Sequence, residues 1–174
     1  MVIPDNVKAA VNEGDVAAVV AWLDDGGDVN GHINHGGYFD TLLMFIPQAH
    51  ELTTRHVELA RMLLHRGADV NLVPNGHGIV GDGYSALHVC VDFQSYVHLR
   101  IHPVLLEIIG IYIAAGANVN SGGVIHADEP RETPLGMALQ FRRPYGVEIH
   151  EGWAHRNLRP QSYYCEPGRH SMRA

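Results

Sequence analysis

Four side chains near the C-terminus are of the types that bind zinc. His150, His155, Cys165 and His170 lie within 21 residues, and imidazole and thiolate groups are the ligands that zinc prefers. Their spacing, His-x4-His-x9-Cys-x4-His, lacks the close Cys-x2–4-Cys pair that most structural zinc sites contain. A metal-dependent enzyme that uses this tail is one hypothesis. A tail without metal is the interpretation that the spacing favours, and no cofactor is expected.

A second segment matches a nucleotide-binding pattern. Residues 76–81 read Gly-His-Gly-Ile-Val-Gly, which fits G-x-G-x-x-G. That fingerprint binds a pyrophosphate when a buried strand precedes it and a helix N-terminus follows it. Here Val-Pro-Asn precedes the pattern and Asp82-Gly83 follows it. The sequence therefore predicts a loop, and no small-molecule substrate is expected.

The clearest periodic feature is a turn that recurs three times. It reads Gly-Gly-Asp-Val-Asn at 26–30, Gly-Ala-Asp-Val-Asn at 67–71 and Gly-Ala-Asn-Val-Asn at 116–120. Apolar residues at helical spacing precede the later copies and predict a buried helix face, as in Val57, Ala60 and Leu63 before the second copy and Tyr112 and Ile113 before the third. Because glycine adopts the left-handed conformation without steric cost, each copy predicts a helix C-terminus. We expect the valine to point inward.

A helix-opening motif alternates with these turns. Residues 133–138 read Thr-Pro-Leu-Gly-Met-Ala, with a threonine cap and proline in the first turn. Residues 85–90 (Ser-Ala-Leu-His-Val-Cys) and 41–46 (Thr-Leu-Leu-Met-Phe-Ile) are looser versions. In this order, the two motifs resemble the ankyrin-repeat family, whose unit runs Thr-Pro-Leu-His-x-Ala, a second helix and then Gly-Ala-Asp-Val-Asn. The resemblance covers about residues 6–140.

The resemblance implies an all-α fold, a helical solenoid of about three to four ankyrin repeats with long β-hairpin-like fingers and an irregular C-terminal cap. Successive Val-Asn pairs are 41 and 49 residues apart, against about 33 in the usual unit. We therefore expect long fingers at 31–40, 72–84 and 121–132, and long loops between paired helices at 47–54 and 93–103.

The expected domain organisation follows from these positions. Residues 1–140 are predicted to hold the repeats, with an N-terminal cap at about 5–30 and repeats at about 31–71, 72–120 and 121–140 onward. Residues 141–174 are predicted to be a C-terminal capping segment, in which Ile149, Trp153 and Leu158 would cover the apolar face of the last repeat.

The resemblance also implies roles for single residues. His88 occupies the histidine position of the opening motif, where the side chain bonds to backbone groups. Asn30, Asn71 and Asn120 occupy the asparagine position that some organisms hydroxylate. From the residue type alone, we expect these asparagines to close their own turns through side chain–backbone hydrogen bonds.

Charge and cysteine content narrow the class of partner. The net charge is −7, and residues 141–174 contribute six arginines against three glutamates, which leaves residues 1–140 at −10. An acidic body repels nucleic acid and attracts a basic protein. No apolar run is long enough to cross a membrane. Two cysteines in unrelated contexts, Cys90 and Cys165, favour a reducing, cytoplasmic location.

We therefore predict a non-catalytic protein–protein interaction module that binds another protein through its fingers and concave face. An alternative is an immunity-type inhibitor that neutralises a basic enzyme or toxin. Neither nucleic acid nor a membrane is an expected partner. The candidate binding residues are apolar and acidic side chains in the fingers: Tyr38, Phe39, Ile79, Val80, Tyr84, Val124, Ile125, Asp82, Asp128 and Glu129.

Overall fold

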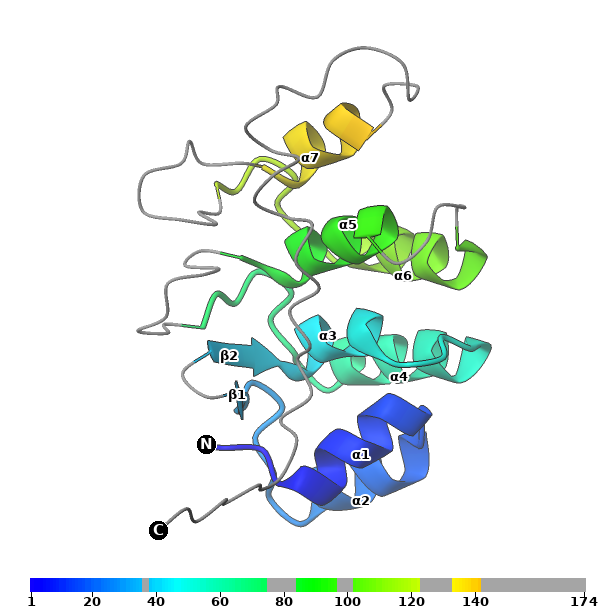
Figure 1. Cartoon of the computed structure of the whole chain (residues 1–174). Helices are drawn as coiled ribbons and strands as arrows, with labels where there is room; N and C mark the ends of the chain where they lie inside the picture. The colour runs from blue at the N-terminus through cyan, green and yellow to red at the C-terminus, as the bar shows by residue number, and fades with distance from the viewer. Residues whose placement is uncertain (36–37, 75–83, 97–101, 123–132, 142–174) are drawn as a thin grey trace, which may run out of the picture. The chain divides into compact units, whose positions relative to one another are not determined.

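The computed structural model describes residues 1–35, 38–74, 84–96, 102–122 and 133–141. All of them lie in the first of two compact units, Met1–Arg142, and the second unit is Arg143–Ala174. The described part of the chain is mostly helical, with one two-stranded antiparallel sheet (Figure 1). This confirms the mainly helical fold class that the sequence predicts.

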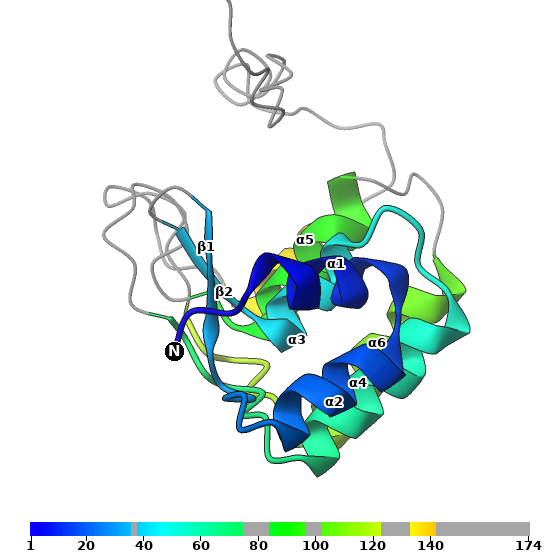
Figure 2. The same ribbon diagram turned by 90° about the horizontal axis from the view of Figure 1, so that it is seen from below.

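Six of the helices form three pairs of consecutive helices that pack together. The pairs are α1 (Asp5–Glu13) with α2 (Val16–Asp24), α3 (Leu42–Phe45) with α4 (Thr54–His65), and α5 (Ala86–Tyr96) with α6 (Pro103–Ala114). A last helix, α7 (Pro134–Phe141), packs against α5. Along the unit, α1, α3, α5 and α7 contact one another in sequence, and α2, α4 and α6 do the same beside them (Figures 1 and 2).

Short polar side chains begin several of these helices. Thr41 Oγ1 accepts a hydrogen bond from Met44 N at 3.2 Å, and Thr133 Oγ1 accepts one from Gly136 N at 3.0 Å. Asp15 Oδ1 does the same for Ala18 N at 3.1 Å. Each bond satisfies one of the amide groups that a helix N-terminus leaves without a partner. The predicted threonine caps are therefore confirmed.

The three recurring glycines end helices in the way that the sequence predicts. Gly26, Gly67 and Gly116 have φ angles of 92°, 89° and 90°, a region that side chains disfavour. In each turn the next amide donates to the carbonyl five residues back, as from Ala68 N to Leu63 O at 3.0 Å. Val70 is buried as expected, whereas Val29 and Val119 are only half-buried.

Three local predictions need correction. The loop predicted to begin at residue 47 begins later. Helix α3 has four residues and continues as the 3-10 helix η1 (Ile46–Gln48), because Pro47 has no amide hydrogen for an α-helical bond. Helix α5 runs through Tyr96, so the loop predicted from Phe93 begins later. Ile113 was expected on the buried face of α6, but it is 48% exposed.

The core runs through all three helix pairs. Its largest fully buried side chains are mostly aliphatic, but Tyr112, His56 and His88 are among them. The Tyr112 hydroxyl donates to the Leu43 carbonyl at 2.7 Å, which links α6 to α3. That carbonyl would otherwise accept from residue 47, which is proline.

The first finger is a β-hairpin. Strand β1 (His32–His35) pairs antiparallel with β2 (Tyr38–Thr41), with His32 opposite Thr41 and Asn34 opposite Phe39. Val2 adds a parallel bridge to His32, supported by hydrogen bonds from Ile3 N to His32 O and from His32 N to Met1 O. The hairpin is therefore anchored on one side by the first residues of the chain.

Candidate partner-binding surface

The two faces of the first hairpin have different surroundings. Residues directly opposite each other in an antiparallel pair share a face, so His32, Phe39 and Thr41 lie together on one face. Ile33 points to the other face and is only 2% exposed in the core. The rings of His32 and Phe39 meet edge to face, with centroids 4.8 Å apart. This aromatic pair is half-buried and forms part of the surface.

A groove lies between this hairpin face and the start of the second finger. Its volume is about 320 Å³, and its walls come from Phe39 and His32 on one side and from Leu72, Val73 and Pro74 on the other. Asn30 and Thr41 complete the lining. Four of these seven residues are apolar and three are polar, so the groove offers contacts for an apolar side chain with polar groups beside it. We call these seven residues the finger groove.

The Asn30 side chain connects two successive turns beside the groove. Its Nδ2 donates to Gly67 O at 3.3 Å, and its Oδ1 accepts from Asp69 N at 2.8 Å. Asn71 repeats this arrangement with the third turn, donating to Gly116 O at 3.0 Å and accepting from Asn118 N at 2.8 Å. Both asparagines therefore connect successive turns, and the expectation that they close their own turns is wrong.

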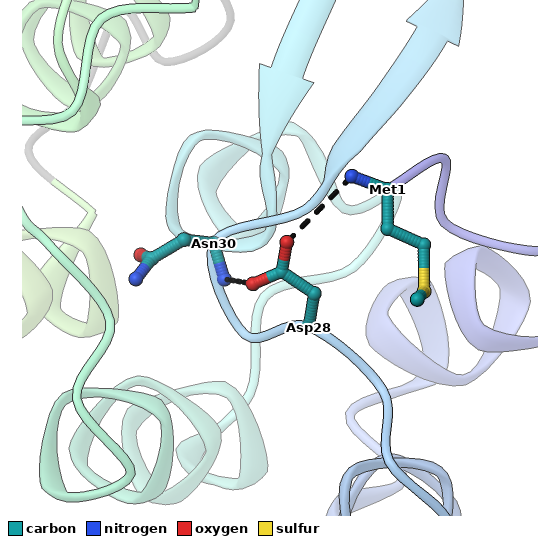
Figure 3. Close-up of polar contacts among 3 residues, drawn as sticks. All are labelled: Met1, Asp28 and Asn30. Carbon is teal, nitrogen blue, oxygen red and sulfur yellow. Dashed lines mark hydrogen bonds and ion pairs between the residues drawn. The ribbon is translucent and has the colours of Figure 1, made fainter.

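The residue two positions earlier closes each turn instead. Asp28 Oδ1 accepts from Asn30 N at 3.0 Å, and Asp69 Oδ1 accepts from Asn71 N at 2.9 Å. In the third turn, Asn118 Oδ1 makes the same bond to Asn120 N. The other oxygen of Asp28 lies 3.6 Å from the Met1 ammonium group (Figure 3). The Asp28 carboxylate thus adjoins Asn30, the asparagine that lines the finger groove, and the Asp69 carboxylate adjoins Asn71 in the next turn.

The predicted binding residues divide among three situations. Phe39 lines the finger groove, and Tyr38 lies opposite His35 in the hairpin. Tyr84 is half-buried and stacks on His88, with centroids 4.9 Å apart, so its ring contacts the start of α5, the helix that follows it. The others lie outside the described residues: Ile79, Val80, Asp82, Val124, Ile125, Asp128 and Glu129.

Sequence reasoning missed most of the groove lining. Leu72, Val73 and Pro74 directly follow the second Val-Asn pair, and this run of apolar residues outside any helix was a usable signal. The partnership of His32 with Phe39 had no such signal, because it depends on the hairpin register.

Two buried histidines use their ring nitrogens in structural hydrogen bonds. His88 Nδ1 accepts from Ser85 N at 3.0 Å, which confirms the predicted bond to backbone. His56 Nδ1 accepts from Thr53 N at 3.1 Å, so its Nε2 carries the hydrogen that faces Asn12 O at 3.3 Å. Both rings cap helices, and His56 also joins α4 to the preceding helix pair.

The described cysteine is unsuited to nucleophilic chemistry. Cys90 is fully buried, and burial raises the pKa of its thiol far above the ordinary range. The pKa of the Tyr112 hydroxyl is also raised, mainly by burial and secondly by the nearby Cys90. Both groups remain protonated at neutral pH, so they act as core side chains.

The metal hypothesis concerns residues beyond the described part of the chain. His150, His155, Cys165 and His170 lie there, as does the Gly-x-Gly-x-x-Gly segment at 76–81. Among the described residues, no group of three or more His, Cys, Asp or Glu side chains is placed to hold a metal ion.

A second hollow of about 360 Å³ is lined mainly by charged residues, including Glu13, Arg55 and Glu58.

Comparisons with other proteins give no assignment. No protein-family model matches this chain, and no curated protein sequence matches it. Within the described ranges, no helix has the length and apolar character that crossing a membrane requires. A functional proposal therefore has to come from the residues and their geometry.

Proposed function

We propose that this chain is a non-catalytic interaction module of the ankyrin-repeat type, which binds another protein through its fingers and concave face. The repeated turns support the family. Three turns share a left-handed glycine, the same bond between residues two apart, and a valine–asparagine ending. Asparagine bridges of one kind connect the first turn to the second and the second to the third. Stacked repeats interact with their neighbours in this way.

The finger groove is the observation that carries the binding function. It has apolar walls and an aromatic pair at the surface, and such sites supply much of the energy of protein interfaces. The side chains in the described core that could take part in catalysis have structural roles instead. His56 and His88 cap helices, and the Cys90 thiol is buried. Binding therefore accounts for the exposed features better than catalysis does.

A library selection tests this function. The full chain would be immobilised and used to select binders from a displayed library of peptides and small protein domains. We expect ligands that bind in solution with one chain per ligand and compete with one another for a single surface. Failure to obtain any saturable ligand, or turnover of a substrate by the purified chain, would overturn the proposal.

A further inference from the structure

We infer that the finger groove binds an apolar side chain of a peptide segment that carries lysine or arginine beside that side chain. This inference depends on the proposed binding function and adds the chemistry of the partner. It comes from the dimensions of the groove, from its apolar walls, and from the carboxylates around it.

The size and walls of the groove limit what can enter. Its volume of about 320 Å³ is near the lower end for ligand sites, which span about 300–1,000 Å³. The walls present Phe39 on one side and Leu72, Val73 and Pro74 on the other. The bridge from Asn30 to Gly67 and Asp69 joins the two turns beside it. One large apolar side chain fits this space better than a helix or a cofactor does.

The segments that form the groove carry negative charge. Residues 28–41 and 69–74 contain three carboxylates, Asp28, Asp40 and Asp69, and no lysine or arginine. Asp28 and Asp69 both bond to the groove residue Asn30, since the Asp28 carboxylate accepts from the Asn30 backbone amide and the Asp69 backbone amide donates to the Asn30 side chain. The Met1 ammonium faces Asp28 at 3.6 Å and offsets part of that charge. A basic segment would complement this field, whereas phosphate groups would be repelled.

The chain itself suggests how to remove these charges without disturbing the turns. Asn118 stands at the position of Asp28 and Asp69 in the third turn and makes the same bond. Asp28→Asn with Asp69→Asn therefore keeps both turn-closing oxygens and removes two charges. A matched control, Glu13→Gln with Glu58→Gln, removes two exposed carboxylates that line the other hollow.

The probes are short fluorescent peptides of defined chemistry. One carries a central phenylalanine between lysines and arginines, a second replaces the phenylalanine by serine, and a third replaces the basic residues by glutamates. Binding to the full chain would be followed by fluorescence anisotropy. We expect the basic phenylalanine peptide to bind more tightly than either of the other two.

The variants are expected to act separately on the two parts of the ligand. Phe39→Ala should weaken binding of the basic phenylalanine peptide by about tenfold or more, as central anchors do. If Phe39→Ala loses the native circular dichroism spectrum, Val73→Ser provides the same test from the opposite wall. The double asparagine variant should weaken binding by roughly threefold for each charge. That loss should disappear at about 0.5 M salt, while the glutamine control and Leu106→Ser on α6 bind as the wild type does.

Several results would overturn the inference. The first is that the serine or glutamate peptide binds as tightly as the basic phenylalanine peptide. The second is that Phe39→Ala and Val73→Ser both keep the wild-type affinity, and the third is that none of the three peptides binds. In these cases a ligand from the library selection with other chemistry would leave the proposed function standing. Failure of the selection itself would remove the proposed function, so the two failures are distinguishable.

Discussion

The bond between Tyr112 and Leu43 gives the sharpest stability prediction. Both residues are fully buried, and the hydroxyl donates to the Leu43 carbonyl at 2.7 Å. In an α-helix that carbonyl would accept from the amide four residues later, but residue 47 is proline. Tyr112→Phe therefore leaves a buried carbonyl without a donor. Such a loss costs about 1–3 kcal/mol of unfolding free energy.

A double-mutant cycle tests this reasoning directly. Pro47→Ala restores an amide at the position from which an α-helix would donate to Leu43. In that background, Tyr112→Phe should cost at least about 1 kcal/mol less than it does in the wild type, because the carbonyl then has a second donor. Urea unfolding followed by circular dichroism measures all four free energies. A Tyr112→Phe cost below about 0.5 kcal/mol, or an equal cost in both backgrounds, would refute the explanation.

Four further predictions concern other parts of the chain. Gly27→Ala should destabilise the wild type by about 1–3 kcal/mol, because a Cβ atom there would overlap both the Trp22 ring and the Trp22 carbonyl oxygen. In a Trp22→Leu background, urea unfolding should show a smaller loss, because the overlap with the ring is removed while the overlap with the backbone oxygen remains; an unchanged loss would show that the ring contributes nothing. Asn71→Ala removes both bonds to the third turn and should lower the free energy of unfolding by about 1–2 kcal/mol, since the site is exposed to competing water. Wild-type stability of that variant would show that the bridge contributes nothing. Because burial raises the pKa of Cys90, unfolding releases its proton at alkaline pH. The stability from this group is therefore complete below the thiol's unfolded pKa and should fall above about pH 9; Cys90→Ala should make the fall less steep, and an identical pH profile would argue against the shift. Finally, elemental analysis of protein purified without an affinity tag should find no stoichiometric zinc, and chelation should leave the melting temperature unchanged. One zinc per chain would instead assign a metal site to the histidine-rich tail.

The local structure of the chain was largely predictable from its sequence. The turn glycines, the threonine caps and the helix that precedes each Gly-x-x-Val-Asn segment follow from rules that involve neighbouring residues only. The position of Phe39 in a surface hairpin was also predictable, since an aromatic residue in a finger had no helix to join.

The contacts between successive turns and between helix pairs were not predictable in the same way. Asn30 and Asn71 bond to turns about 40 residues away, and no local pattern distinguishes this from closing their own turns. The structure around the short α3 also depends on a residue far along the sequence. Pro47 ends the helix, and Tyr112 supplies the donor that the Leu43 carbonyl lacks. The finger groove combines both effects, since its two walls come from different fingers.

A hydrogen–deuterium exchange footprint tests the central claim most directly. The full chain would be measured alone and saturated with a ligand from the library selection, and the protected segments would be compared. We predict that protection concentrates in residues 28–41 and 69–74, which contain the hairpin, the two turns and the groove walls. Protection confined to α2, α4 and α6, with the hairpin exchanging as in the free protein, would contradict a finger-mediated interaction.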